Sequence, residues 1–326
     1  MSAVLLVQRV PPMRASLRSA WRLAHVGAFV LVLAGAASAA GATGELFTFA
    51  VFGDTPYNEE DESRFPDFIG ELNREDVAFV VHVGDLKSAA EPCTDEVYLE
   101  RRRWFGLSHH PFAYLPGDND WLDCTRSLFD PRDPRERLHK LREVYFVNGH
   151  GLGQAPLGAV RQSDRSPHHS FPEHLRWVHQ GVLFVTLNVP GPDDNSRDAA
   201  ERGKRGAAIS AWLADSFSLA RERRMRAVTV LIHASPWAPS GKPRRAFDSL
   251  LTQLARETRR FGLPVLMVHG DEHHYRVDQP LPDPERNTPL ANFTRVEVFG
   301  SPTMNWVRVR VIEEAGRIRF FVTPGS

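Results

Sequence analysis

Short apolar runs alternate with amphipathic segments along most of the chain. Continuous stretches of Val, Ile, Leu and Phe that stop at Gly or at a polar residue predict buried strands, and apolar side chains at helical spacing predict helices packed on them. The predicted strands span 47–53, 77–84, 111–115, 182–189, 227–232 and 264–268. The predicted helices span 62–74, 95–107, 135–146, 199–224 and 244–261.

The last part of the chain has a different pattern. The runs 294–299, 306–312 and 317–322 have only turns between them, which predicts an antiparallel meander. Alternating strands and helices followed by such strands predict an α/β core, with two sheets between two helix layers. The polar segments 160–174 and 191–204 are predicted to be long surface loops.

Composition and charge exclude several classes of protein. The chain has 326 residues, of which 42% are hydrophobic and 25% charged, so a disordered chain and a multi-span membrane protein are excluded. The 40 basic and 40 acidic residues balance, but residues 1–39 hold four Arg and no acid. The remainder has a net charge of −4 (36 − 40), which argues against nucleic-acid binding as a main role. Residues 45–326 are long enough to form one domain with a sizeable core.

The first 39 residues have the order of a secretory signal peptide. A basic region precedes the uncharged apolar run 26–37, and Ala37-Ser38-Ala39 provides the small residues that a signal peptidase recognises, with cleavage after Ala39 or Ala40. An uncleaved N-terminal anchor is the alternative, although the run is shorter than the ~20 residues that a span needs. In both cases we expect the rest of the chain outside the cytoplasm, periplasmic or secreted, with no stable membrane span after cleavage.

Export bears on the two cysteines of the chain. Cys93 and Cys124 lie 31 positions apart, and each follows a predicted strand end. Outside the cytoplasm such a pair tends to be oxidised, and two neighbouring strands would bring their loops together. We therefore expect a disulfide; two buried free thiols are the alternative.

Polar residues that bind metals recur where the predicted strands end. They are Asp54, Asp85, Asp118, His233 and the segment Asp271-Glu272-His273, and each of the Asp residues follows a Gly. Ligands of α/β sheets bind beyond the carboxyl ends of the strands, so parallel strands would bring these side chains to one rim. Clustered carboxylates are costly without a cation, and Asp together with His suits a first-row divalent or trivalent metal. Taken singly, a Gly-Asp pair is also typical of a turn, and His233 of a hydrogen-bonded core histidine.

The order of these residues resembles the order of the motifs in the calcineurin-like metallophosphoesterase superfamily. The resemblance extends from residue 45 to residue 322. The motifs of the superfamily are D-x-H, G-D, G-N-H-D, a strand-end H and G-H-x-H, and they correspond here to Asp54, Gly84-Asp85, 117–120, His233 and 270–273. The resemblance implies a four-layer α/β/β/α sandwich of two mixed sheets with antiparallel C-terminal strands. It also implies two metal ions and the hydrolysis of phosphoesters by a metal-activated water.

The resemblance further assigns metal ligands by position. It implies that Asp54, Asp85 and His273 hold a first ion. It implies that Asp118, His233 and Asp271 complete a second site, which shares Asp85 with the first as a bridge.

Four positions depart from the pattern of the superfamily. Pro56 replaces the His of D-x-H, Asp118 and Asn119 replace the Asn and His of G-N-H-D, and Asp271 replaces the first His of G-H-x-H. The site then has four Asp where a typical one has two, and hard oxygen ligands favour Mn²⁺, Mg²⁺, Ca²⁺ or iron over Zn²⁺, which stays a candidate. One ion and two ions are both compatible with this set. Tyr57 is either a phenolate ligand that fills the gap left at Pro56 or a packing or hydrogen-bonding residue.

Three further residues are candidates for catalysis. Asn119 stands where the superfamily has its leaving-group histidine, but an amide cannot supply a proton near neutral pH. Asp120 is expected to orient its neighbours. Lys87 is expected to offset the charge of Asp85 or to contact a phosphate; a solvated loop lysine is the alternative.

The sequence thus predicts an exported metal-dependent phosphoesterase that hydrolyses esters or anhydrides of small phosphorylated substrates. The alternative is a relative of the same fold that binds a metal or a phospho-ligand and has lost catalysis, and Pro56 and Asn119 favour it. The substrate and the oligomeric state stay open.

Overall fold

The computed structural model describes residues 44–126, 130–165, 167–286 and 288–325. The chain divides into two units, residues 1–39 and 40–326, and all described residues belong to the second unit. The predicted signal peptide therefore lies outside the described residues. Within them, no helix combines the length and the apolar character needed to cross a membrane.

The first of two sheets contains both ends of the described chain. Its strands are β1 (Gly44–Phe52), β2 (Val80–His82), β3 (Phe112–Tyr114), β11 (Val307–Glu314) and β12 (Arg317–Pro324). They lie in the order β12-β11-β1-β2-β3. Strands β1, β2 and β3 are parallel, and β11 pairs antiparallel with both β1 and β12. The carboxyl ends of β1, β2 and β3 therefore lie at one edge of this sheet.

The second sheet is formed by the middle of the chain. Its strands are β4 (Val160–Arg161), β5 (Leu175–His179), β6 (Val182–Thr186), β7 (Ala227–Leu231), β8 (Val265–His269), β9 (Arg276–Asp278) and β10 (Phe293–Glu297). They lie in the order β4-β5-β6-β7-β8-β10-β9. Strands β6, β7, β8 and β10 are parallel, and β4, β5 and β9 are antiparallel to their neighbours.

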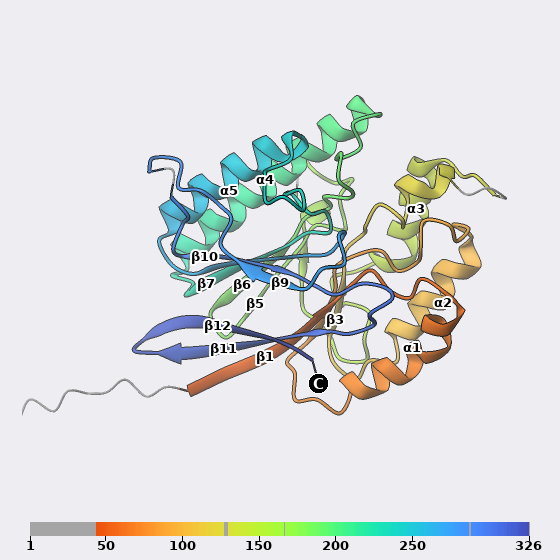
Figure 1. The fold of residues 1–326 in the computed structure, drawn as a ribbon, viewed down its shortest axis with the longest axis horizontal. Helices are drawn as coiled ribbons and strands as arrows, with labels where there is room; N and C mark the ends of the chain where they lie inside the picture. The colour runs from red at the N-terminus through yellow and green to blue at the C-terminus, as the bar shows by residue number, and fades with distance from the viewer. Residues whose placement is uncertain (1–43, 127–129, 166, 287, 326) are drawn as a thin grey trace, which may run out of the picture. The chain divides into compact units, whose positions relative to one another are not determined.

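Helices cover the outer face of each sheet (Figure 1). Over the first sheet lie α1 (Glu59–Leu72), α2 (Asp95–Phe105) and α3 (Pro134–Tyr145), and over the second lie α4 (Ala199–Glu222) and α5 (Asp248–Phe261). Short 3₁₀ turns span Leu122–Arg126, Gln162–Asp164 and Arg245–Phe247. The predicted four-layer α/β/β/α sandwich of two mixed sheets is confirmed.

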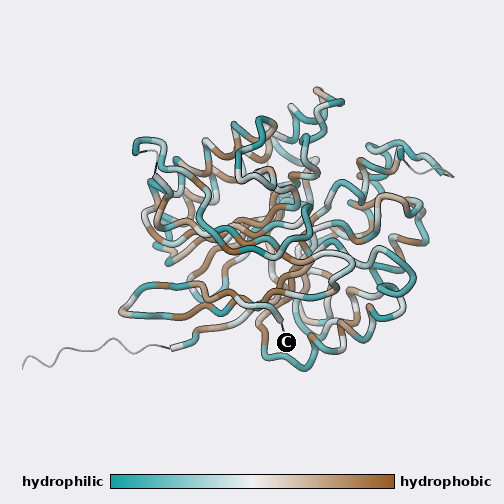
Figure 2. The backbone as a smooth tube through the Cα atoms, in the orientation of Figure 1, coloured by the Kyte–Doolittle hydropathy of each residue, from teal (hydrophilic) through white to brown (hydrophobic). Residues whose placement is uncertain are grey.

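The alternation of side chains along β1 connects these layers. Phe47, Phe49 and Val51 pack between the two sheets, whereas Ala50 and Phe52 pack against the helices over the first sheet. All five side chains are buried, because neither face of this strand meets water. Figure 2 shows the same division, with hydrophobic strands inside and hydrophilic segments on the outer helices.

Local signals fix where the helices begin and end. The side chain of Asn58 accepts a hydrogen bond from the backbone N–H of Asp61 at the start of α1, and Thr94 does the same for Val97 at the start of α2. Helix α5 ends at Gly262, whose φ of 70° lies in the left-handed region. These caps place the helix ends within a few residues of the predicted ones.

The predicted C-terminal meander is wrong in its first strand. Residues 293–297 form β10, which pairs parallel with β8 and antiparallel with β9 in the second sheet. The chain then crosses to the first sheet, and the backbone N–H of Ser301 donates to the carbonyl of Asp54 (2.9 Å) on the way. A turn shows where one strand ends, but the pairing of the next strand depends on which sheet buries its apolar side chains.

The segment 160–174 is a surface loop over most of its described residues, as its polar composition predicts, but its two ends are not. It contains β4 and leads into β5, and Gln162, Glu173 and His174 are buried. The Glu173 carboxylate accepts from Arg142 (2.9 Å), and the Oε1 atom of Gln162 lies 2.6 Å from Nδ1 of His174. Polar side chains can be buried when they pair in this way, so a polar composition did not show that the ends of this segment are buried.

Candidate metal centre

Side chains from both sheets meet beyond the carboxyl ends of five strands. Asp54, Asp85 and Asp118 follow β1, β2 and β3, and His233 and Asp271 follow β7 and β8. Potential ligand atoms of Asp54, Asp85 and His233 lie within 4.8 Å of one another, and the same holds for Asp118, His233 and Asp271. The structure thus brings together five of the six side chains predicted to bind metal.

His233 stands at the centre of this group. Its Nδ1 lies 2.9 Å from the carbonyl oxygen of Val83, which can only accept, so Nδ1 carries the proton of this bond. Its Nε2 lies 3.3 Å from Oδ1 of Asp85 and 3.2 Å from Oδ1 of Asp118. The Val83 carbonyl therefore aims Nε2 at the carboxylates.

The sixth predicted ligand, His273, contacts the group at its edge. Its Nε2 lies 3.5 Å from Oδ1 of Asp54, and its Nδ1 lies 2.8 Å from the carbonyl oxygen of Ser301. The same Oδ1 of Asp54 accepts from the backbone N–H of Asp271 (3.0 Å), and Oδ2 of Asp271 accepts from that of Ser235 (2.9 Å). The backbone groups that orient these side chains have no sequence signal of their own.

The backbone is strained at the same positions. The φ angles of Asp54, Asp85, Asp271 and His273 are 54°, 59°, 81° and 60°, all in the left-handed region. Each such residue costs on the order of 1–3 kcal/mol, and strain of this kind persists where the surrounding structure holds a functional site. Gly84, with φ 104°, adds a turn that a side chain rarely allows, immediately before Asp85.

Burial and mutual charge shift the acidities of the group. Burial raises the pKa of Asp85 well above its usual value and that of Asp271 to about 7. Burial also opposes charge on His233, yet the carboxylates of Asp85 and Asp118 raise its pKa well above the usual range. At Asp118, the contact with His233 outweighs burial and lowers the pKa. The carboxylates thus exceed the positive charge that the protein provides, which favours a bound cation.

Two atoms of the group fit such a cation directly. Oδ2 of Asp54 is buried and has no hydrogen-bond partner, and Nε2 of His233 is buried against the carboxylates of Asp85 and Asp118. Both atoms are metal ligands in proteins, and a buried carboxylate oxygen without a partner is costly. A Cβ at Gly117 would collide with Oδ1 of Asp85, and one at Gly270 with Oδ2 of Asp54, so the glycines leave room for the carboxylates. The side chains present therefore fit a metal ion.

Asn119 and Tyr57 lie together beside Asp85. The hydroxyl of Tyr57 donates to Oδ2 of Asp85 (2.6 Å) and accepts from Nδ2 of Asn119 (3.0 Å). The backbone N–H of Asn119 donates to Oδ1 of Asp85 (3.0 Å). The ring of Tyr57 packs edge-on against that of His273, with centroids 5.3 Å apart. Tyr57 therefore reaches the centre as a hydrogen-bonding residue.

The other two predicted catalytic residues do not face the potential ligand atoms in this way. Asp120 is fully buried and accepts from the backbone N–H groups of Asp85 (2.9 Å) and Leu86 (2.8 Å). The ammonium group of Lys87 donates to the carbonyls of Ser88 (2.9 Å) and Glu91 (3.0 Å). Lys87 is buried, so it is not a solvated loop lysine. A catalytic role for either residue stays a prediction.

The predicted disulfide is present beside the centre. Cys93 and Cys124 are bonded, with their Cα atoms 5.6 Å apart. Their loops follow the neighbouring strands β2 and β3, as the spacing of the sequence predicted. Sγ of Cys93 lies 3.9 Å from the carbonyl of Asn119, so the bond supports the loop that carries Asp118 and Asn119.

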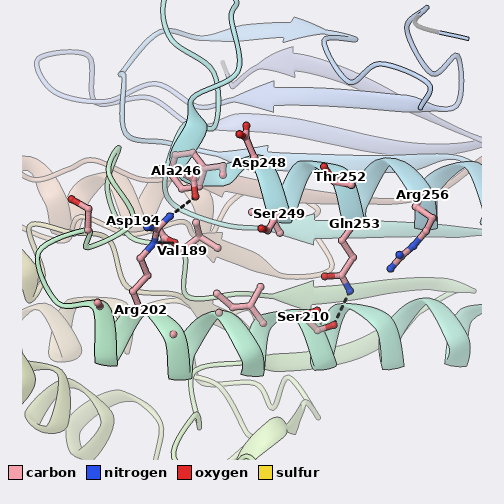
Figure 3. Close-up of a pocket in the computed structure, with 17 residues that line it drawn as sticks. Val189, Asp194, Arg202, Ser210, Ala246, Asp248, Ser249, Thr252, Gln253 and Arg256 are labelled. Carbon is pink, nitrogen blue, oxygen red and sulfur yellow. Dashed lines mark hydrogen bonds and ion pairs between the residues drawn. The ribbon is translucent and has the colours of Figure 1, made fainter. Parts of the chain in front are cut away.

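A separate hollow of about 870 Å³ lies between α4 and α5. Figure 3 shows its charged lining, which includes Asp194, Arg202 and Arg256. Arg202 donates to the carbonyl of Ala246 (2.8 Å) at one end. None of the side chains predicted to bind metal lines this hollow, so it is distinct from the metal centre.

Solved structures of phosphatases share the fold. A dimetal phosphatase from Danio rerio is similar with a TM-score of 0.51 at 12% identity, over 87% of this chain and 100% of the other. The structure of PhoD is similar with a TM-score of 0.53 at 11% identity, over 88% of this chain and 70% of the other. No family model matches the sequence, and no curated protein matches it significantly. Two mixed sheets between helix layers, a rim of Asp and His side chains and these similar structures together show that the chain has the calcineurin-like metallophosphoesterase fold.

Proposed function

We propose that the protein is an exported, metal-dependent phosphoesterase that hydrolyses esters or anhydrides of small phosphorylated molecules. One observation carries the proposal: ligand-type side chains from two sheets converge on His233, and Oδ2 of Asp54 among them is buried without a hydrogen-bond partner. Structural side chains rarely bury carboxylates in this way without a cation. The similar phosphatase structures support the fold, and the convergent side chains support the chemistry.

Six side chains would hold the metal: Asp54, Asp85, Asp118, His233, Asp271 and His273. When bound, the metal supplies Lewis acidity, which activates water and neutralises charge on the phosphoryl group. The chain itself fixes the geometry. The Val83 carbonyl holds the proton on Nδ1 of His233, and Asp120 holds the backbone of Asp85 through a buried hydrogen bond.

Asn119 restricts the leaving groups that the site would accept. Its Nδ2 already donates one hydrogen to Tyr57, and the other is available for a leaving oxygen. Neither hydrogen can be transferred as a proton near neutral pH. Leaving groups that need little protonation, such as phenolates and phosphates, are therefore favoured over alkoxides.

A non-catalytic protein of the same fold is the second candidate. Pro56 and Asn119 stand where two histidines of the superfamily's motifs would be, and a proline side chain cannot bind metal. Such a protein would bind metal without hydrolysing phosphoesters. The two candidates therefore differ in turnover and agree on metal binding.

Hydrolysis by residues 40–326 separates these candidates. Metal is first removed with a chelator, and Mn²⁺, Mg²⁺ or iron is then added back with bis-p-nitrophenyl phosphate or p-nitrophenyl phosphate as substrate. We expect release of p-nitrophenol that requires metal and is lost in Asp85→Asn. Asp215→Asn is the matched control, because Asp215 lies on α4 and pairs with Arg176 (2.8 Å) away from the centre. Metal binding without turnover in any of these metals would favour the second candidate.

Export has a test of its own. The N-terminal sequence pattern and the disulfide support it, since disulfides persist in oxidising compartments. We expect the protein to be recovered outside the cytoplasm with an N-terminus at Ala40 or Gly41. Recovery from the cytoplasm with residues 1–39 intact would contradict export.

A further inference from the structure

We propose that the chain holds one metal ion, on Nε2 of His233, and that the hydrogen-bonded pair of Tyr57 and Asn119 takes the place of a second ion beside Asp85. This inference rests on the proposed function, because it concerns the same centre. It differs from the two-ion arrangement that the order of the motifs implies.

Both groups of potential ligand atoms include His233 and depend on the same nitrogen of its ring. Asp54 and Asp85 form one group with His233, and Asp118 and Asp271 form the other with it. Nδ1 of His233 is bound to the Val83 carbonyl, so Nε2 is the one ring nitrogen left. A ring nitrogen has a single lone pair and binds one ion. Any ion bound at Nε2 of His233 therefore takes its other ligands from one of these two groups of carboxylates or from both.

The distances fit that conclusion. Within each group the ligand atoms lie within 4.8 Å of one another. Two ligands on opposite sides of one ion, each at about 2.4 Å, are about 4.8 Å apart. Nε2 of His233 is 3.3 Å from Asp85 and 3.2 Å from Asp118. One ion beside Nε2 is thus within reach of carboxylates from both sheets.

Asp85, the residue implied as the bridge, accepts a hydrogen bond at each of its two carboxylate oxygens. Oδ2 accepts the hydroxyl proton of Tyr57 at 2.6 Å, and Oδ1 accepts the backbone N–H of Asn119 at 3.0 Å. Each carboxylate oxygen has two lone-pair sites, so Oδ1 keeps one for the ion beside Nε2 of His233. The Tyr57 bond takes one of the two sites of Oδ2, and a second ion bound there would have to share that oxygen with Tyr57.

The site implied for Asp54, Asp85 and His273 has fewer ligands than the motifs of the superfamily would provide. Pro56 provides none, so Asp54, Asp85 and His273 remain on this side, and Nε2 of His273 lies 3.5 Å from Oδ1 of Asp54. Nδ2 of Asn119 secures Tyr57 from the other side (3.0 Å). The side of Asp85 that faces Tyr57 thus lacks the ligand that the superfamily's D-x-H histidine would provide, and Tyr57 is hydrogen-bonded there from two sides.

The number of bound ions tests the proposal without any measurement of turnover. Native mass spectrometry of residues 40–326 in increasing free Mn²⁺ counts the ions, and electron paramagnetic resonance distinguishes an isolated Mn²⁺ from an exchange-coupled pair. For the wild type we expect one ion per chain and the spectrum of an isolated ion. Two tightly bound, coupled ions would overturn the proposal, and no bound ion would overturn both it and the proposed function.

Variants at position 57 test whether Tyr57 stands in for the second ion. Tyr57→His removes the hydroxyl and supplies a ligand, so we expect two ions and a coupled spectrum. Tyr57→Phe only frees Oδ2 of Asp85, and we expect the dissociation constant of the second ion to fall about ten-fold or more. Tyr145→Phe is the matched control: it removes a buried hydroxyl that donates to the carbonyl of Tyr98 (2.7 Å), and the ion count should not change.

The outcomes separate this proposal from the proposed function. One ion in the wild type without hydrolysis would leave the inference intact and remove the phosphoesterase. Two bound ions together with hydrolysis would overturn the inference and support the phosphoesterase. If Tyr57→His does not fold, Tyr57→Phe decides, and a second-ion dissociation constant equal to that of the wild type would overturn the role given to Tyr57.

Discussion

Asp120 offers the sharpest test of how the metal centre is held in place. Its buried carboxylate accepts from the backbone N–H groups of Asp85 (2.9 Å), Leu86 (2.8 Å) and Gly117 (2.7 Å) and from the hydroxyl of Tyr114 (2.8 Å). The donors come from the loop after β2, from β3 and from the loop after β3. One carboxylate thus ties together the two loops that carry predicted metal ligands.

The substitution Asp120→Asn keeps the shape and removes the charge. Three of the donors meet Oδ2, and the fourth, the N–H of Leu86, meets Oδ1. An amide oxygen at the Oδ2 position keeps three neutral bonds, but the amide nitrogen then faces the N–H of Leu86, which loses its acceptor. A bond to a charged group contributes about 1.5–3 kcal/mol and a neutral one about 1 kcal/mol. One lost bond and three weakened ones therefore lower the free energy of unfolding by at least about 3 kcal/mol.

Calorimetric unfolding of the metal-free protein measures this loss. For a domain of this size about 1 kcal/mol shifts the Tm by about 2–4 °C, so we expect Asp120→Asn to melt at least roughly 6 °C below the wild type. Asp123→Asn is the control in the next turn, because Asp123 bonds to the half-exposed Arg126 (2.5 Å) and its loss should cost less than about 1 kcal/mol. A Tm of Asp120→Asn within about 2 °C of the wild type would refute the reasoning.

Three further substitutions test other parts of the account. Replacing Cys93 and Cys124 together by Ser opens a loop of 31 residues and should lower the free energy of unfolding by about 3–4 kcal/mol in calorimetry, whereas an unchanged Tm would mean that the bond does not constrain the unfolded chain. Burial lowers the pKa of His174 from 6.5 to about 4, so between these pH values the unfolded chain binds a proton that the folded one does not. Stability should fall by up to about 3 kcal/mol as the pH drops through this window, and less in His174→Asn; parallel denaturation profiles of the two proteins would contradict this. Asn119→His restores a proton donor and should raise the turnover of alkyl phosphates about ten-fold or more over any gain with p-nitrophenyl phosphate; equal gains would place Asn119 away from the leaving group.

Much of the fold follows from local patterns in the sequence. Runs such as 47–53 and 182–189 are apolar at most positions on both faces, as expected for strands buried on both faces, and the structure contains β1 and β6 there. The sheet that β10 joins was not predictable in the same way, because its residues 293–297 fit a strand of either sheet. The strand β5 was missed although it pairs with the next strand, β6, across the turn at 180–181. The buried Glu173 beside it was missed because its partner Arg142 lies 31 positions away in the sequence.

The candidate centre was predictable in its residues and not in its internal contacts. Strand-end positions identified Asp54 and His233, because parallel strands deliver their ends to one rim. The sequence could not show that Tyr57 bonds to Asp85, since the two lie 28 positions apart and meet only when β1 and β2 pair. Nor could it show that two groups of ligands share His233, because that depends on which ring nitrogen the Val83 carbonyl occupies.

The position of the metal tests the central claim most directly. Crystals of residues 40–326 grown with Mn²⁺ would show the ion in an anomalous difference map. The account predicts a peak about 2.0–2.6 Å from Nε2 of His233 and from carboxylate oxygens of Asp85, Asp118 or Asp271. A map with no peak at this rim, under Mn²⁺ concentrations that fill comparable sites, would contradict the claim that these side chains form a metal centre.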